Sequence, residues 1–127
     1  MESTEVSLTF PAAAEHIRLA RLVASGLATQ AGFGIDEIED LRIGVDELCS
    51  LLVQHADPAS KMTLDFRVED AAVFLRAVAP PADPNAGLAT DQLTVLILKA
   101  AVDHHDVAAD RNLLTVELVK RRASASN

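Results

Sequence analysis

The chain has 127 residues, a length that suits one domain with its own hydrophobic core. Half of the residues are hydrophobic, which excludes a largely disordered chain, and the net charge of −8 disfavours nucleic acids and anionic membranes as partners. The single cysteine, Cys49, excludes an internal disulfide, and we interpret it as a small helix residue without a chemical role.

The N-terminal half reads as one strand followed by two helices. Glu5–Phe10 alternates between apolar and polar side chains, which predicts a half-buried strand that ends at Pro11. Apolar residues near helical period predict a helix over Ala12–Gln30 and a second helix over Ile35–Ala56, which ends before Pro58. The first ten residues lack a signal-peptide pattern, and no apolar run reaches the roughly 20 residues that a bilayer requires. We therefore expect a cytoplasmic protein.

The second helix carries one charged residue at the edge of its apolar face. That face is formed by Leu41, Val45, Leu48 and Leu52 at helical spacing. Glu47 lies beside the face, where an ordinary surface helix has no special need for a carboxylate. From spacing alone, Glu47 is either a solvated or paired surface residue or a functional one.

The C-terminal half reads as a hairpin, a loop, a helix and a final strand. Alternating residues predict strands over Met62–Val68 and Val73–Ala79, joined by a tight turn. A proline-rich loop follows over Ala79–Ala89. A third helix is predicted over Thr90–Asp103, and a last strand over Asn112–Val119. The apolar face of that third helix is predicted to contain Leu93, Leu96, Ile97 and Ala100.

These elements predict an α/β two-layer sandwich of three helices and a mostly antiparallel sheet. The order is β-α-α-β-β-α-β, with room for a further short strand around Val107. We expect a single domain over residues 1–120. Residues 121–127 are polar and are predicted to form a disordered tail.

The element order and the second helix together resemble the RsbW/SpoIIAB anti-sigma factors, small serine kinases with the GHKL, or histidine-kinase-like, ATPase fold. The resemblance covers Val6–Lys120 and is strongest over Ile38–Ala56, where family members read like DLKIAVSEACTNAVQHA. The residues that match are Asp40, Leu41, Ile43, Val45, Glu47, Cys49, Val53, Gln54, His55 and Ala56. The resemblance implies that Glu47 occupies the position of the base that helps to activate the attacking hydroxyl.

The other nucleotide positions of that family hold unsuitable residues here. The magnesium-binding asparagine is replaced by Leu51, which offers no oxygen ligand. The glycines and the aspartate of two further ATP motifs are replaced by Pro80, Ala82, Pro84, Gln92 and Thr94. The resemblance therefore implies an inherited fold with a degenerate site, and we expect no bound ATP or magnesium and no catalysis.

The resemblance implies an anti-sigma factor that sequesters a stress-type sigma factor, is relieved by an antagonist of the STAS class, and forms a homodimer. Arg18 and Arg21 on the first helix are either a solvated, salt-bridged surface or part of a partner contact. Two alternatives stay open. One is an active serine/threonine kinase with a diverged ATP site, which would use ATP, magnesium and Glu47. The other is a partner-switching module of the same fold whose partner is not a sigma factor.

The histidines do not predict a metal site or a hydrolase. His104 and His105 are adjacent and do not share a helix face, and no third ligand follows at motif spacing. We interpret them, together with His55, as cations near helix ends. His16 has no serine or aspartate arrangement around it.

Overall fold

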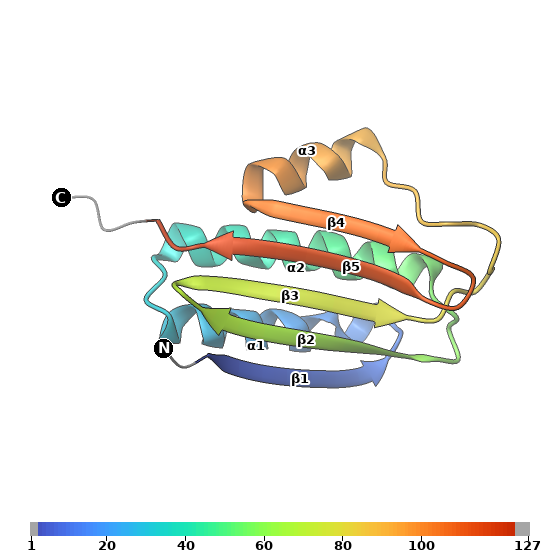
Figure 1. The fold of residues 1–127 in the computed structure, drawn as a ribbon, viewed down its shortest axis with the longest axis horizontal. Helices are drawn as coiled ribbons and strands as arrows, with labels where there is room; N and C mark the ends of the chain where they lie inside the picture. The colour runs from blue at the N-terminus through green and yellow to red at the C-terminus, as the bar shows by residue number, and fades with distance from the viewer. Residues whose placement is uncertain (1–2, 124–127) are drawn as a thin grey trace.

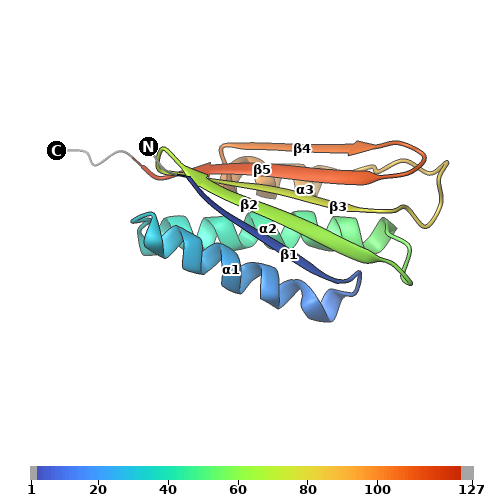
Figure 2. The same ribbon diagram turned by 60° about the horizontal axis from the view of Figure 1, so that its bottom comes forward.

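The computed structural model describes residues 3–123, which form one five-stranded antiparallel sheet and three α-helices (Figure 1). The strand order is β1-β2-β3-β5-β4, and the helices lie on one side of the sheet (Figure 2). The predicted α/β two-layer class is therefore confirmed. In chain order, the elements are β1 (Thr4–Pro11), the short 3-10 turn η1 (Ala14–His16), α1 (Ile17–Gln30), α2 (Ile35–His55), β2 (Lys61–Glu69), β3 (Ala72–Ala79), α3 (Gln92–Ala101), β4 (His104–Ala109) and β5 (Leu114–Arg121).

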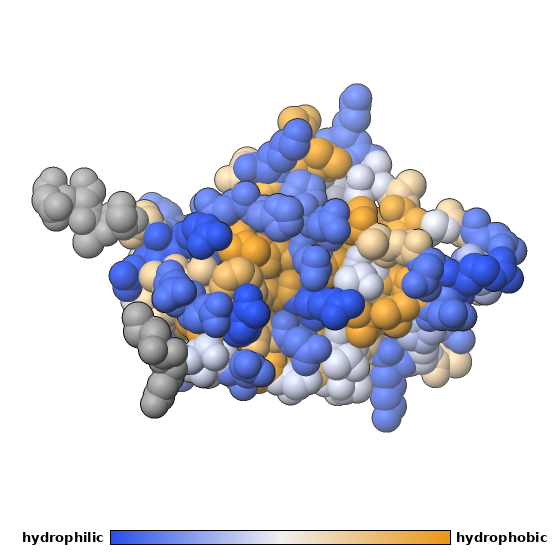
Figure 3. Space-filling view, viewed as in Figure 1, coloured by the Kyte–Doolittle hydropathy of each residue, from blue (hydrophilic) through white to orange (hydrophobic). Residues whose placement is uncertain are grey.

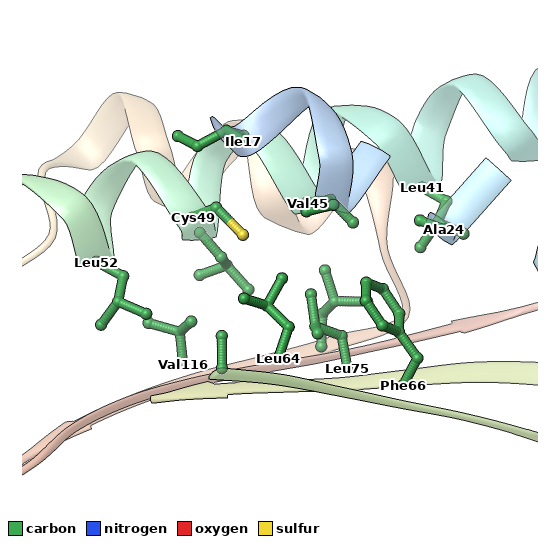
Figure 4. Packing of buried hydrophobic residues seen from close by; sticks show 14 of the residues in the cluster. Ile17, Ala24, Leu41, Val45, Cys49, Leu52, Leu64, Phe66, Leu75 and Val116 are labelled. Carbon is green, nitrogen blue, oxygen red and sulfur yellow. The ribbon is translucent and has the colours of Figure 1, made fainter. Parts of the chain in front are cut away.

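The core lies between α2 and the sheet. The four residues of the predicted apolar face of α2 have no exposed surface. Figure 4 shows Leu41, Val45 and Leu52 of this face above side chains that rise from β2, β3 and β5, among them Leu64, Leu75 and Val116. These strand residues alternate along their strands, so every second side chain reaches the helices. Among the described residues, no helix is long and apolar enough to span a bilayer.

The first helix begins later than predicted. Ala12 does not enter it, because its backbone N–H donates to the carbonyl oxygen of Ser60 at 3.0 Å and prolongs the pairing of β1 with the start of β2. The chain then makes the 3-10 turn before α1 begins at Ile17. Leu22 of α1 is 67% exposed, so this leucine does not belong to the core.

The third helix also differs from the prediction, both in length and in the face that it buries. It spans Gln92–Ala101 and buries Leu98 and Ala101, whereas Leu93 and Leu96 are 66% and 64% exposed. Apolar residues lie almost all round this helix, so its periodicity does not identify the buried face. The contacts with α2 and β4 decide which side is covered.

The C-terminal region holds more ordered structure than the sequence predicts. The short strand near Val107 is the six-residue edge strand β4. The last strand extends to Arg121, whose backbone N–H donates to Asp103 Oδ2 at 2.7 Å. Arg122 Nη1 donates to the carbonyl oxygen of Ala31 at 3.0 Å. The predicted tail therefore does not begin at Arg121, and residues 124–127 lie outside the described part of the chain.

Gly44 marks the place where α2 approaches the sheet and the end of α3. A Cβ at this position would lie 2.6 Å from Val102 Cγ1 and 3.3 Å from Leu118 Cδ2. Both neighbours are buried, and a valine side chain has little freedom to move aside. The absence of a side chain at Gly44 therefore sets the distance between the layers.

We predict that Gly44→Ala lowers the free energy of unfolding by about 1–3 kcal/mol, because the added methyl group overpacks the core. The matched control is Gly26→Ala on α1, where nothing lies within 4 Å of the added Cβ. That change should raise stability by about 0.5–1 kcal/mol through the helix propensity of alanine. Urea unfolding of both variants measures the difference. Equal stabilisation by the two changes would contradict this prediction, because it would show that Val102 and Leu118 can move away from the added methyl group without loss of stability.

Glu37 in the first turn of α2 ties together two separate parts of the chain. Its Oε1 accepts the backbone N–H of Gly34 at 2.8 Å, and its Oε2 accepts the backbone N–H of Ala123. These two backbone donors, the one from Ala123 first, lower the pKa of the Glu37 carboxyl below 4.5. The ionised form is thus bound more strongly in the folded chain.

We predict that Glu37 contributes a pH-dependent part of the stability. Because its pKa is lower in the folded than in the unfolded chain, its contribution is complete well above pH 4.5 and is lost as the pH falls below 4.5. Thermal unfolding of wild type and Glu37→Gln should differ most at neutral pH and converge in acid. Glu39→Gln, which removes the exposed pair with Arg42, should have a much smaller effect. A difference that persists unchanged at acid pH would contradict the assignment.

Candidate functional site

Glu47 lies at the side of α2, between the buried face and solvent. The burial of Leu48 turns the neighbouring Glu47 away from the sheet and toward α3, and its side chain is half-buried. Leu51 follows one turn later on the same side of the helix and is 7% exposed. The helix therefore presents a carboxylate and an apolar side chain together.

A depression of about 390 Å³ lies between this side of α2 and the start of α3. Two residues from the predicted ATP positions, Leu51 and Thr94, line it together with Glu47. The remaining lining residues are Ser50, Gln54, His55, Ala89, Thr90 and Asp91. The structure therefore brings Thr94 of α3, which is distant in sequence, close to Glu47 and Leu51 of α2.

The other predicted ATP positions lie outside this depression. Gln92 lines a neighbouring one, also of about 390 Å³, on the outer side of α3. Pro80 and Ala82 contact the C-terminal end of α2 through their backbones: the Pro80 carbonyl accepts the N–H of Asp57, and the N–H of Ala82 donates to the carbonyl oxygen of His55, both at 2.9 Å. Pro84 is exposed in the loop.

Asp91 shapes the electrostatics of the depression. It is the N-cap of α3, and its Oδ1 accepts the backbone N–H of Thr94 at 2.7 Å. This hydrogen bond lowers the pKa of the Asp91 carboxyl, so the group is ionised at neutral pH. Of the described residues that line the depression, none is Lys or Arg, so the carboxylates of Asp91 and Glu47 give it a negative character.

The start of α3 is therefore not an open anion site. A free helix N-terminus offers unpaired backbone N–H groups to a phosphate. Here one of those donors already serves Asp91, whose negative charge would repel a phosphate. Sequence reasoning did not single out Asp91, Ser50 or Gln54 as site residues. Ser50 and Gln54 could have been found from their helical spacing to Glu47, but the approach of Asp91 depends on how α3 packs.

A family model described as the histidine kinase-like ATPase domain matches residues 10–120. The chain belongs to this family. The match runs from the end of β1 into β5 and includes all three helices and the depression beside Glu47. The GHKL-type fold that the sequence predicts is thereby confirmed.

Curated relatives of the chain are serine-protein kinases named RsbW. Those from Bacillus cereus, Bacillus thuringiensis and Bacillus anthracis are each 40% identical over 52 residues, which is 41% of this chain and 32% of the relative. The matched stretch thus spans about a third of each relative. A crystal structure of the RsbU and RsbW domains of a Mycobacterium tuberculosis protein aligns over 98% of this chain and 34% of its own, with a TM-score of 0.71 and 14% identity, and shows the same fold. The predicted likeness to RsbW is confirmed at this level.

The two arginines proposed for partner binding differ in their surroundings. Arg21 Nη1 lies 3.3 Å from Asp46 Oδ2, so this arginine joins α1 to α2 across the helix pair. Arg18 is exposed one turn earlier. Within this ATPase domain, Arg21 therefore has a structural contact, while Arg18 points to a surface that another molecule can reach.

The remaining candidates occupy ordinary structural positions. His104 and His105 lie in β4 on opposite faces of the strand, which corrects their interpretation as helix-end cations. His55 does lie in the last turn of α2, with its Nδ1 3.0 Å from the carbonyl oxygen of Leu51. No group of three metal-binding side chains occurs among residues 3–123. Burial raises the pKa of the Cys49 thiol to about 12, so it stays protonated and unreactive at neutral pH.

Proposed function

We propose that this chain is a non-catalytic anti-sigma factor. It sequesters a stress-type sigma factor in the cytoplasm and releases it when an antagonist of the STAS class competes for the same protein. The proposal extends the similarity to RsbW, and it assigns no chemical step to the domain. Binding alone inhibits the sigma factor by covering the surface that it offers to RNA polymerase.

The observation that carries the proposal is the lining of the depression beside Glu47. Phosphoryl transfer depends on holding a metal and a nucleotide in position. Magnesium needs several oxygen ligands, but Leu51 supplies a hydrocarbon side chain at the family's asparagine position. Asp91 occupies the N-terminus of α3 with a negative charge. Leu51 removes one oxygen ligand and Asp91 opposes a phosphate, so the proposed function involves no phosphoryl transfer, and Glu47 is proposed to be a remnant of the base position.

Two surfaces support protein partners in this proposal. Arg18 is exposed on α1 and is available to an acidic group of the sigma factor or of the antagonist. Arg21 supports that surface through its ion pair with Asp46. The second surface is the outer face of the sheet, which is proposed to serve a homodimer.

The outer face of the sheet suits a second copy of the chain because its charges have both signs. Figure 3 shows apolar atoms between charged side chains over the strands. A shallow depression of about 710 Å³ on this face includes Phe74 and Val119 together with Arg67, Arg76 and Glu117. The guanidinium carbon of Arg67 lies 4.2 Å from the centre of the Phe74 ring, and Arg76 Nε lies 3.7 Å from Glu117 Oε2. A surface with apolar groups and charges of both signs can be self-complementary, so two copies can pack against each other across a twofold axis.

Two other functions have some support. Glu47 lies in the depression, which favours an active serine/threonine kinase with a diverged site that still uses ATP and magnesium. A partner-switching module with a partner other than a sigma factor would share every feature described above. Phosphate transfer to a serine of the antagonist by the wild type, and not by Glu47→Ala, would establish the kinase.

We predict that the chain does not bind Mg-ATP or Mg-ADP with a dissociation constant below about 1 mM, equivalent to roughly 4 kcal/mol of binding free energy. The reason is the combination of Leu51 and Asp91 at positions where a metal ligand and a phosphate would stand. Isothermal titration calorimetry measures this directly, with a Bacillus cereus RsbW serine-protein kinase titrated in parallel as the control. A saturable heat of binding with a dissociation constant below about 1 mM would overturn the proposed function.

We further predict that release from the sigma factor is independent of nucleotide. A ligand shifts an equilibrium only through its different affinity for the two states. A nucleotide that does not bind this domain therefore cannot change its preference between the sigma factor and the antagonist. The displacement curve would be measured at fixed sigma factor with increasing antagonist, in ATP, in ADP and in neither. Three superimposed curves are expected. A midpoint that moves about tenfold between nucleotides, about 1.4 kcal/mol of coupling, would return the protein to the kinase class.

A further inference from the structure

The outer face of α3 is an apolar surface that the domain leaves uncovered. Leu93 and Leu96 lie one turn apart and are 66% and 64% exposed. Leu96 and Val95 line the outer depression of about 390 Å³, beside the start of the helix. Two large leucines beside a hollow form the kind of surface that receives another apolar helix.

This surface is held rigidly at both ends of α3. At the N-terminus, the side chain of Asp91 caps the helix. At the C-terminus, Lys120 Nζ donates to the carbonyl oxygen of Ala101 at 2.9 Å and lies 3.6 Å from Asp40 Oδ2. The exposed leucines are therefore presented on a fixed helix, which keeps the entropic cost of docking low.

Charge is distributed unevenly along this surface. The outer depression and the one beside Glu47 share Thr90 and Asp91, so they adjoin at the N-terminal end of α3. Glu47 and Asp91 bring two carboxylates to that end. The positive residue of the helix, Lys99, lies in its last turn at the opposite end. A partner that covers the leucines therefore meets negative charge at one end only.

We propose that the outer face of α3, with the two depressions at its N-terminal end, docks an amphipathic helix of a partner protein. The partner helix places apolar side chains on Leu93 and Leu96 and a Lys or Arg in the depression beside Glu47 and Asp91. The long side chain of Lys or Arg can lay its methylene groups on Leu51 while its charge reaches the carboxylates. This inference rests on the proposed function, because the partner's cation takes the place that a nucleotide would need.

The probe is a pair of synthetic helical peptides of about 15 residues with one shared leucine stripe. In the first peptide, the residues at one end of the stripe are Arg. In the second, they are Glu. Each is titrated into the ¹⁵N-labelled full chain, and amide shifts are followed by NMR. The Arg peptide should shift amides of α3 and of α2 near Glu47, with saturation below about 1 mM, and the Glu peptide should not.

Three variants separate the apolar from the charged contribution. Leu96→Ser and Asp91→Asn should each raise the dissociation constant of the Arg peptide by about fivefold or more. Asn is as good an N-cap as Asp, so Asp91→Asn removes the charge and leaves α3 capped. The matched control is Leu22→Ser on α1, a leucine with a similar exposure of 67%, which should leave the affinity unchanged.

Several outcomes overturn the inference. These are the absence of amide shifts from the Arg peptide up to about 1 mM, equal binding of the Glu peptide, or an equal loss of affinity from Leu22→Ser and Leu96→Ser.

Mg-ATP is titrated into the same labelled sample. If neither the peptide nor Mg-ATP binds, this docking surface is wrong and the proposed function stands. If Mg-ATP shifts the amides around Glu47, the proposed function fails, whatever the peptides do.

Discussion

The arrangement of this domain depends on the burial of one face of α2 against the sheet. Leu41, Val45, Leu48 and Leu52 have no exposed surface, and together they fix both the position and the rotation of the helix. With that rotation set, the residues between them have no freedom of direction. Glu47 must lie at the side of the helix, and Leu51 must lie on the same side one turn later in the sequence. The orientation of the candidate site is therefore a consequence of core packing.

The second constraint is the close approach of α2 to its neighbours at Gly44. Because no side chain separates the layers there, Val102 and Leu118 reach the helix backbone, and α3 ends directly beside α2. Lys120 then satisfies the last carbonyl of α3, and Asp91 satisfies an amide at its start. One backbone donor at the start of α3 is thus already bound by the side chain of Asp91. The same packing leaves Leu93 and Leu96 exposed on the opposite side of α3.

Sequence patterns predicted most of the fold because the strands and α2 have strongly periodic sequences. Their alternation or helical spacing gathers most of the large apolar residues on one side, and that side is the one that is buried. Boundaries were less well predicted where the backbone had another partner. Ala12 pairs with Ser60 instead of joining a helix, and Arg121 is held by Asp103 instead of entering a tail. Such partners are distant in sequence, so local patterns contain no trace of them.

By itself, the sequence determined the fold class, the buried face of α2, and the presence of Leu51 beside Glu47, because helical spacing alone relates those two residues. Tertiary structure decided what faces them. Asp91, Thr94 and Thr90 come to the depression only because Leu98 and Ala101 form the buried side of a helix that is apolar almost all round. Local periodicity is nearly degenerate for such a helix, and the shape of α2 and β4 resolves it. The same packing leaves Leu93 and Leu96 at the surface.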